Sequence, residues 1–213
     1  MPLCVQVNLM TPLQLVLASE SPRRRALLKE AGFDFDVVPV KVSEIPNKNL
    51  NANDQILDIA RRKARAAFEV LKVDRKAPFI VLTADTEVIF GGGPLGKPQD
   101  KDDAYRILKL LSGRFHEVIT GVCVINSETG LEFSQTETTQ IYFKHLQDQE
   151  IWDYINTGEP MDKAGAYGIQ GRGGDFVEKY VGPFDNVVGL PMDLVKILLQ
   201  KGGWPPPSSA GCK

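Results

Sequence analysis

Apolar residues along the chain fall into short continuous runs that predict β-strands. Residues 13–18 and 79–90 are such runs, the second rich in β-branched and aromatic side chains. Residues 116–126 and 131–143 predict two further strands, joined as a hairpin through Glu128-Thr129-Gly130. Two more strands are expected over 33–42 and 176–181. The chain thus has enough strand-forming segments for one substantial sheet.

Between these runs, apolar positions three and four residues apart predict helices. Ser21 suits an N-cap and Pro22 a first helical position, so a helix is expected from there to about Ala31. A longer helix is expected after an N-cap at Asn53. Its predicted buried face consists of Ile56, Ile59, Ala60, Ala64, Ala67, Phe68 and Leu71. Further helices are expected after Asp100, over 148–156 and over 191–200, which together with the strands predicts an α/β protein.

Composition narrows the classes of function. The chain of 213 residues has 25 basic and 27 acidic side chains, a net charge of −2, which excludes a general positive field for coating nucleic acid. Two histidines and three widely spaced cysteines exclude the usual zinc motifs, so a catalytic metal would be an oxygen-liganded divalent ion, Mg²⁺ or Mn²⁺. The odd cysteine number predicts reduced thiols and a cytoplasmic location, and no apolar run reaches membrane-spanning length.

Charged residues stand at three positions where they are costly. Arg23, Arg24 and Arg25 open a helix whose dipole disfavours cations there, which indicates either an anion site or a solvated turn. Lys63 lies on the apolar face of the long helix, so it either snorkels to water or meets an anion. Asp85 lies inside an apolar strand, where a carboxylate is costly unless it faces a cation or a metal. In a regular strand Glu87 shares the face of Asp85, and Thr86 points to the other face.

Two glycine-rich segments have features of ligand-binding loops. Gly91 to Lys97 matches most of a P-loop, but Pro98 replaces the hydroxyl residue that ligates magnesium, so a P-loop is rejected. Lys97 is then either a phosphate contact or an ordinary hairpin lysine. Residues 158–175 predict a long ordered loop in which Gln170 offers an amide donor and acceptor for a base edge.

Six short motifs in this order resemble the Maf family of nucleoside triphosphate pyrophosphatases. They span most of the chain and are LASESPRR at 17–24, ADT at 84–86, GKP at 96–98, TGV at 120–122, KAGAYGIQG at 163–171 and GLP at 189–191. The resemblance implies an α/β fold like that of the inosine triphosphate pyrophosphatases: a long, twisted mixed β-sheet flanked by helices, with two lobes around a nucleotide cleft. It also implies a Maf-like domain over 12–203, an N-terminal extension over 1–11 and a proline-rich tail over 204–213.

The resemblance further implies hydrolysis between the α and β phosphates with a divalent metal, giving a monophosphate and pyrophosphate. It assigns phosphate binding to Ser19, Arg23, Lys63 and Lys97, with Lys63 and Lys97 counted as catalytic. It makes Asp85 the catalytic acid and metal ligand and Glu44 a second metal ligand. Arg24, Thr86 and Gln170 resemble the trio of members that prefer dTTP and UTP. A homodimer is also implied.

The proline-rich tail suggests a further C-terminal domain, as in fusions of a Maf-like domain to an O-methyltransferase-like domain. Two alternatives to an enzyme stay open at this point. One is a catalytically silent nucleotide-binding module that regulates the attached domain. The other, a nucleic-acid binder using Arg23 to Arg25 and Arg61 to Arg65, is disfavoured by the balanced charge and by the lack of interleaved aromatic residues.

Overall fold

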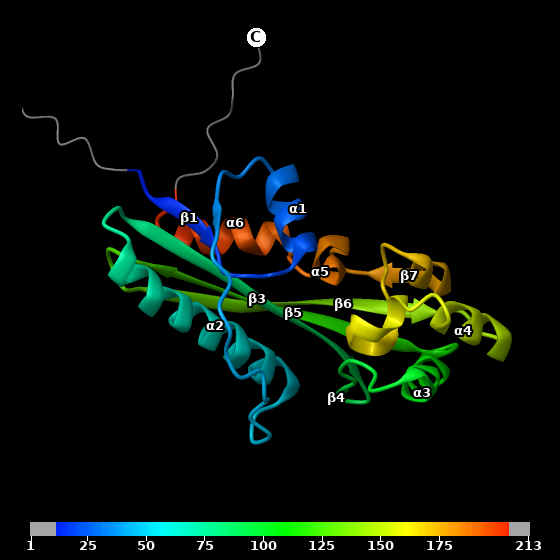
Figure 1. Cartoon of the computed structure of the whole chain (residues 1–213). Helices are drawn as coiled ribbons and strands as arrows, with labels where there is room; N and C mark the ends of the chain where they lie inside the picture. The colour runs from blue at the N-terminus through cyan, green and yellow to red at the C-terminus, as the bar shows by residue number, and fades with distance from the viewer. Residues whose placement is uncertain (1–11, 205–213) are drawn as a thin grey trace, which may run out of the picture.

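The computed structural model describes residues 12–204, which form a mixed β-sheet flanked by helices (Figure 1). The sheet order is β2-β1-β3-β5-β6-β7, and β4 pairs with β3. Strand β1 is parallel to β2 and β3, while the other pairs are antiparallel. The strands are β1 (Gln14–Leu17), β2 (Asp36–Val37), β3 (Phe79–Phe90), β4 (Gly93–Pro94), β5 (Phe115–Asn126), β6 (Glu132–Phe143) and β7 (Val177–Val181). The expected mixed α/β sheet is confirmed.

Six α-helices and three short 3₁₀ segments complete the described chain. The helices are α1 (Pro22–Glu30), α2 (Ala52–Asp74), α3 (Lys101–Leu111), α4 (Asp148–Ile155), α5 (Phe184–Val188) and α6 (Met192–Lys201). The 3₁₀ segments are η1 (Glu159–Asp162), η2 (Ala164–Ala166) and η3 (Arg172–Phe176). None of the described helices combines the length and apolar character needed to cross a membrane.

The helices bury the sheet in two regions at opposite ends of its long strands. At one end, α2 packs on Val16, Val81 and Cys123, and α6 packs on their strand neighbours, which point the other way. At the other end, α3, α4 and the 3₁₀ segments pack over Val88, Val118 and neighbouring residues in a second core (Figure 1). Alternation along β3 and β5 thus supplies both faces with apolar side chains.

One edge of β3 is left open between these two regions. Strand β1 stops beside Leu82, where Ala18 N donates to the Leu82 carbonyl, and pairing resumes only at Ile89, opposite Pro94. No strand of the described chain pairs with this side of β3 in between. Side chains from both faces of β3 can therefore reach one space.

Several predicted elements differ from the structure. The N-cap of the long helix is Asn51, not Asn53, because the Asn51 side chain accepts from Asp54 N at 2.9 Å. The strand expected over 33–42 shrinks to the two residues of β2, which lies at the sheet edge with one neighbour. Helix α5 was not predicted, and the expected loop over 158–175 contains the 3₁₀ segments. The expected extension over 1–11 and the tail beyond Trp204 lie outside the described residues.

Candidate active site

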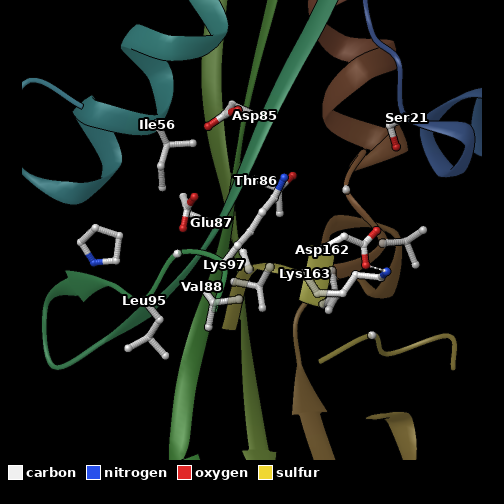
Figure 2. Close-up of a pocket in the computed structure, with 18 of the residues that line it drawn as sticks. Ser21, Ile56, Asp85, Thr86, Glu87, Val88, Leu95, Lys97, Asp162 and Lys163 are labelled. Atoms are coloured by element: carbon white, nitrogen blue, oxygen red, sulfur yellow. Dashed lines mark hydrogen bonds and ion pairs between the residues drawn. The ribbon is translucent and has the colours of Figure 1, made fainter. Parts of the chain in front are cut away.

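A cavity of about 770 Å³ opens along the free edge of β3 (Figure 2). Its walls come from the start of α1, the N-terminal half of α2, β3, the β4–α3 connection, the 159–171 segment and the end of α5. The sequence-predicted site residues that line it are Arg23, Arg24, Glu44, Lys63, Asp85, Thr86, Lys97 and Gln170. Ser19 does not line the cavity but accepts a hydrogen bond from Arg24 Nη1 at 3.3 Å. Predicted site residues as far apart in sequence as Arg23 and Gln170, 147 positions, thus line one cavity.

Lys63 meets two carboxylates rather than solvent. Its Nζ lies 2.7 Å from Asp85 Oδ1 and 2.6 Å from Glu44 Oε1. The side chains of Lys63 and Asp85 are only 13% and 12% exposed, whereas that of Glu44 is 61% exposed. The hydrogen bond from Lys63 is the main cause that lowers the pKa of Glu44 below its usual value. The two costly charges on α2 and β3 therefore offset each other across the cavity wall.

Arg24 organises the opposite side of β3. Its Nε donates to the Gly189 carbonyl at 2.8 Å and its Nη2 to Thr86 Oγ1 at 3.1 Å. Burial is the main cause that lowers the pKa of Arg24, and the charge of Asp85 opposes that shift. Because Arg24 is held from α1 to β3 and to the end of α5, it ties three walls of the cavity together.

Two residues without a predicted role extend this network into the core. Thr120 Oγ1 lies 2.9 Å from Thr86 Oγ1 and donates to the Asn186 carbonyl at 3.0 Å. Asn186 Nδ2 in turn donates to the Val118 carbonyl at 2.9 Å. A polar Thr120 within the apolar run of β5 was a usable sequence signal. Asn186 had none, because α5 itself was not predicted.

Asp85 and Glu87 project toward α2, as alternation predicts, while Thr86 points toward α1. Figure 2 shows the two carboxylates on the side of β3 that faces Ile56 of α2, away from Asp162 and Lys163. Glu87 Oε2 is buried and has no hydrogen-bond partner in the described chain. Burial, helped by the charge of Asp85, raises the pKa of Glu87 to about 7, although backbone N–H groups of Gly96 and Val88 oppose the shift. Glu87 thus lines the cavity, although the sequence assigns it no role.

Arg23 and Lys97 supply positive charge that is not neutralised within residues 12–204. Both line the cavity, and neither has a carboxylate within 4.0 Å in that part of the chain. Arg23 lies in the first turn of α1, whose N-cap Ser21 also lines the cavity. Lys97 follows Gly96, which turns the chain with φ +65°. Together with a helix N-terminus, these cations suit a ligand with several negative charges.

A family model described as Maf-like protein matches residues 14–202. The chain belongs to the Maf family. A dTTP/UTP pyrophosphatase of Bdellovibrio bacteriovorus is 75% identical over 187 residues, covering 88% of this chain and 97% of that protein. A dTTP/UTP pyrophosphatase of Caldicellulosiruptor bescii is 43% identical over 90% of this chain and 96% of its own.

A similarity among solved structures is more distant. A dITP/XTP pyrophosphatase from Mycobacterium abscessus matches 62% of this chain and 73% of its own length, with a TM-score of 0.38 and 15% identity. The curated Maf relatives are covered over 96–97% of their own length. The names and lengths of these curated relatives lend no support to the expected fusion with a further C-terminal domain, nor to a regulatory module serving one.

The donor chemistry of this Maf site suits a hard divalent cation. No group of three His, Cys, Asp or Glu side chains within residues 12–204 is already arranged to hold an ion. Nevertheless Asp85, Glu44 and Glu87 all line the cavity with carboxylate oxygens, and the buried Glu87 Oε2 has no hydrogen-bond partner within residues 12–204. Oxygen ligands of this kind are those that Mg²⁺ and Mn²⁺ prefer.

Proposed function

We propose that this Maf protein hydrolyses dTTP and UTP, and modified pyrimidine nucleotides of the same shape, to the monophosphate and pyrophosphate. The main support is that one cavity combines unneutralised cations, Arg23 and Lys97, with the Lys63–Asp85 pair. Two curated relatives carry the name dTTP/UTP pyrophosphatase, one at 75% identity. The unit that carries this activity would span residues 12–203.

The cavity would bind the triphosphate through its cations. A triphosphate carries about four negative charges, which must be neutralised before water can attack phosphorus. Arg23 and the start of α1 would hold the phosphates at one end, and Lys97 and Lys63 would stabilise charge on the departing pyrophosphate. Ser19 would contribute indirectly, because its hydroxyl is held by Arg24.

Asp85 would act at the reacting phosphate, where Lys63 holds its carboxylate in place at 2.7 Å. In this position the carboxylate can orient the attacking water and accept its proton. Asp85 and Glu44 would also hold the divalent ion, Mg²⁺ or Mn²⁺, whose contribution when bound is Lewis-acid polarisation of phosphate oxygens. The Lys63 ammonium neutralises both carboxylates when they hold no other cation.

Gln170 would read the base in the cavity that the Arg24–Thr86 pair also lines. Its amide can donate to one carbonyl of uracil or thymine and accept from N3–H. By analogy with base readout, such a bidentate pair contributes about 1–3 kcal/mol of discrimination.

The products of turnover decide this proposal. The purified chain is incubated with dTTP or UTP and Mg²⁺ or Mn²⁺, and the products are separated by anion-exchange chromatography. We expect dTMP or UMP together with pyrophosphate. A nucleoside diphosphate with orthophosphate, or no turnover of either nucleotide, would overturn the proposal.

Replacing Asp85 tests the role of its carboxylate. We expect Asp85→Asn to lower kcat by about 10²–10⁴-fold, the usual contribution of a positioned acid or base, while the far-UV circular dichroism stays unchanged. Asp193→Asn is the matched control, because the Asp193 side chain is 95% exposed on α6. Undiminished turnover by the Asp85 variant would remove Asp85 from the mechanism.

Two expectations from the family resemblance remain predictions. The homodimer is checked by sedimentation equilibrium of the pure chain, and the cytoplasmic location by fractionation of the cells that make it. A monomer at all concentrations, or a different compartment, would contradict them.

A further inference from the structure

The glycine-rich segment that carries Gln170 is wrapped around two polar side chains, Tyr154 and Glu159. Tyr154 Oη accepts from Gly168 N at 3.0 Å and donates to Glu159 Oε1 at 3.0 Å. Glu159 Oε2 accepts from Arg172 N at 3.1 Å, and Oε1 receives a longer contact from Gly173 N at 3.4 Å. Tyr154 and Glu159, called the loop clamp below, therefore hold the segment on both sides of Gln170.

The glycines of this segment lie against the loop clamp. A Cβ added to Gly171 would lie 2.2 Å from Glu159 Oε1, and one added to Gly173 would lie 2.7 Å from Tyr154 Oη. Neither glycine has a left-handed φ, so it is close approach that leaves no space for a side chain at these positions. The backbone approaches the two polar groups as closely as glycine allows.

Tyr154 is anchored in the core, whereas Glu159 begins η1 and lines the cavity. Tyr154 on α4 is 2% exposed, and its ring meets that of Phe176 edge-on with centroids 5.0 Å apart. Burial is the main cause that raises the pKa of Tyr154 above its usual value, so its hydroxyl stays protonated and continues to donate. The Tyr154 hydroxyl, which binds both Gly168 and Glu159, is therefore itself held in place by packing.

The side chain of Gln170 is not held by hydrogen bonds of its own within the described residues. It is exposed at the cavity wall, and none of the hydrogen bonds within residues 12–204 involves its side chain. Its position follows from a turn in which Gly171 N donates to the Gly168 carbonyl at 3.1 Å, and from the clamp's attachments at Gly168 and Arg172 on either side. Without them, binding a base would require the segment to be ordered at that moment, which weakens affinity.

We propose that Tyr154 and Glu159 are positioning residues that hold the Gln170 segment ready for the pyrimidine base and thereby set base selectivity. This inference rests on the proposed function of the cavity. The phosphate-binding groups Lys63, Asp85 and Lys97 lie on α2, β3 and the β4–α3 connection, outside the clamped segment. Loss of the clamp should therefore affect nucleotide binding and selectivity more than the chemical step.

Tyr154→Phe tests the clamp by removing a single oxygen. We expect KM for dTTP to rise about tenfold, since two hydrogen bonds each contributing about 0.5–1.5 kcal/mol are lost, while kcat changes less than threefold. We expect the ratio of kcat/KM for dTTP to that for dCTP to fall about three- to tenfold. Hydrogen exchange measured by mass spectrometry should accelerate about tenfold in peptides covering 168–173 and stay unchanged in α2 and β3.

Two further variants separate the clamp from general loss of structure. Tyr142→Phe is the matched control, because the Tyr142 hydroxyl donates to Gln140 Oε1 on β6, away from the cavity lining, and it should alter neither kinetics nor exchange in 168–173. Glu159→Gln keeps the shape of the side chain. It places an amide NH₂ group opposite a group that donates to the Glu159 carboxylate, so it should reproduce the rise in KM. It also serves as the test if Tyr154→Phe fails to fold by circular dichroism.

Hydrogen exchange tests whether the clamp holds the segment, and the kinetics test whether the clamp affects base binding and selectivity. Unchanged exchange over 168–173 in the folded variants would overturn the clamp. Faster exchange with unaltered KM and selectivity would show that the clamp has only a structural role and would also overturn the proposal. If the wild-type chain turns over no nucleotide, the proposed function fails first, and hydrogen exchange together with dTTP affinity by calorimetry then decides whether the clamp positions a base site.

Discussion

At the scale of single residues, Lys63 and Asp85 show why unfavourable placements are informative. Each is costly within its own element, Lys63 on the apolar face of α2 and Asp85 within β3. Their 2.7 Å contact removes much of that cost, because each charge becomes the partner that the other requires. A charged residue on an otherwise apolar face thus indicated that another element places an opposite charge next to it.

We expect Lys63→Met to lower the free energy of unfolding by about 3 kcal/mol, the lower end of the range for breaking a buried ion pair. The value lies at the lower end because the second partner, Glu44, is largely exposed and keeps access to water. Urea unfolding followed by circular dichroism checks this. Lys72→Met on the same helix is the control, since its pair with Glu69 is exposed and should contribute less than about 1 kcal/mol. Equal losses in both variants would contradict the argument.

At the scale of elements, the contact between α2 and the sheet fixes the position of Lys63. Thr83 Oγ1 on β3 donates to the Ala60 carbonyl of α2 at 2.8 Å. On β5, Gly121 lies directly under Ile56, where an added Cβ would be 3.2 Å from both backbone and side-chain atoms of Ile56. The helix rests on the sheet with no spare space at Ile56, about two helical turns before Lys63.

We therefore expect Gly121→Ala to reduce the free energy of unfolding by about 1–3 kcal/mol, the usual cost of overpacking, and to lower turnover by displacing α2 and Lys63. Chemical unfolding and a dTTP hydrolysis assay measure the two effects. Gly93→Ala is the matched control, because an added Cβ there meets no atom within 4 Å and its φ is not left-handed. If both variants behave alike, the close contact under Ile56 does not position the helix.

At the scale of the whole molecule, the second core contains a buried histidine that makes stability depend on pH. His116 is 1% exposed, its Nε2 lies 2.7 Å from Tyr167 Oη, and its ring packs against Phe143. Its Nδ1 has no hydrogen-bond partner within the described residues. Burial lowers the pKa of His116 from 6.5 to about 3. Folding therefore holds this imidazole neutral at pH values where the unfolded chain protonates it.

Because the unfolded state binds the extra proton between about pH 6.5 and 3, the stability contributed at neutral pH is lost as pH falls through this window. From pH 7 to pH 5 we expect the free energy of unfolding to drop by about 2 kcal/mol from His116 alone, at about 1.4 kcal/mol per pKa unit. Urea unfolding of the wild type and of His116→Gln at both pH values isolates this contribution. An equal drop in the two proteins would show that His116 does not cause it.

Across these scales, the sequence predicted the elements best where one local pattern dominated. Strand β3 follows from a run of apolar and β-branched residues, the buried face of α2 follows from apolar positions three and four residues apart, and Ser21 caps α1 as expected. The predictions were wrong where neighbouring residues compete or where context decides. Asn51 and Asn53 are equally good caps by residue type, and only the geometry with Asp54 selects Asn51. Strand β2 is short because a single edge neighbour supports it.

The sequence by itself determined which residue types this Maf protein brings to its cavity: the arginines of α1, a lysine on an apolar helical face and an acid in an apolar strand. Only the tertiary structure decided their partners, because Lys63–Asp85, Arg24–Thr86 and Tyr154–Gly168 join different elements or distant parts of the chain. Capping and periodicity act over a few residues, so they can be recognised in sequence. Side-chain pairs between distant elements depend on where β1 ends and on how closely α2 packs against the sheet. Both are set by the packing of the whole molecule, which no short stretch of sequence specifies.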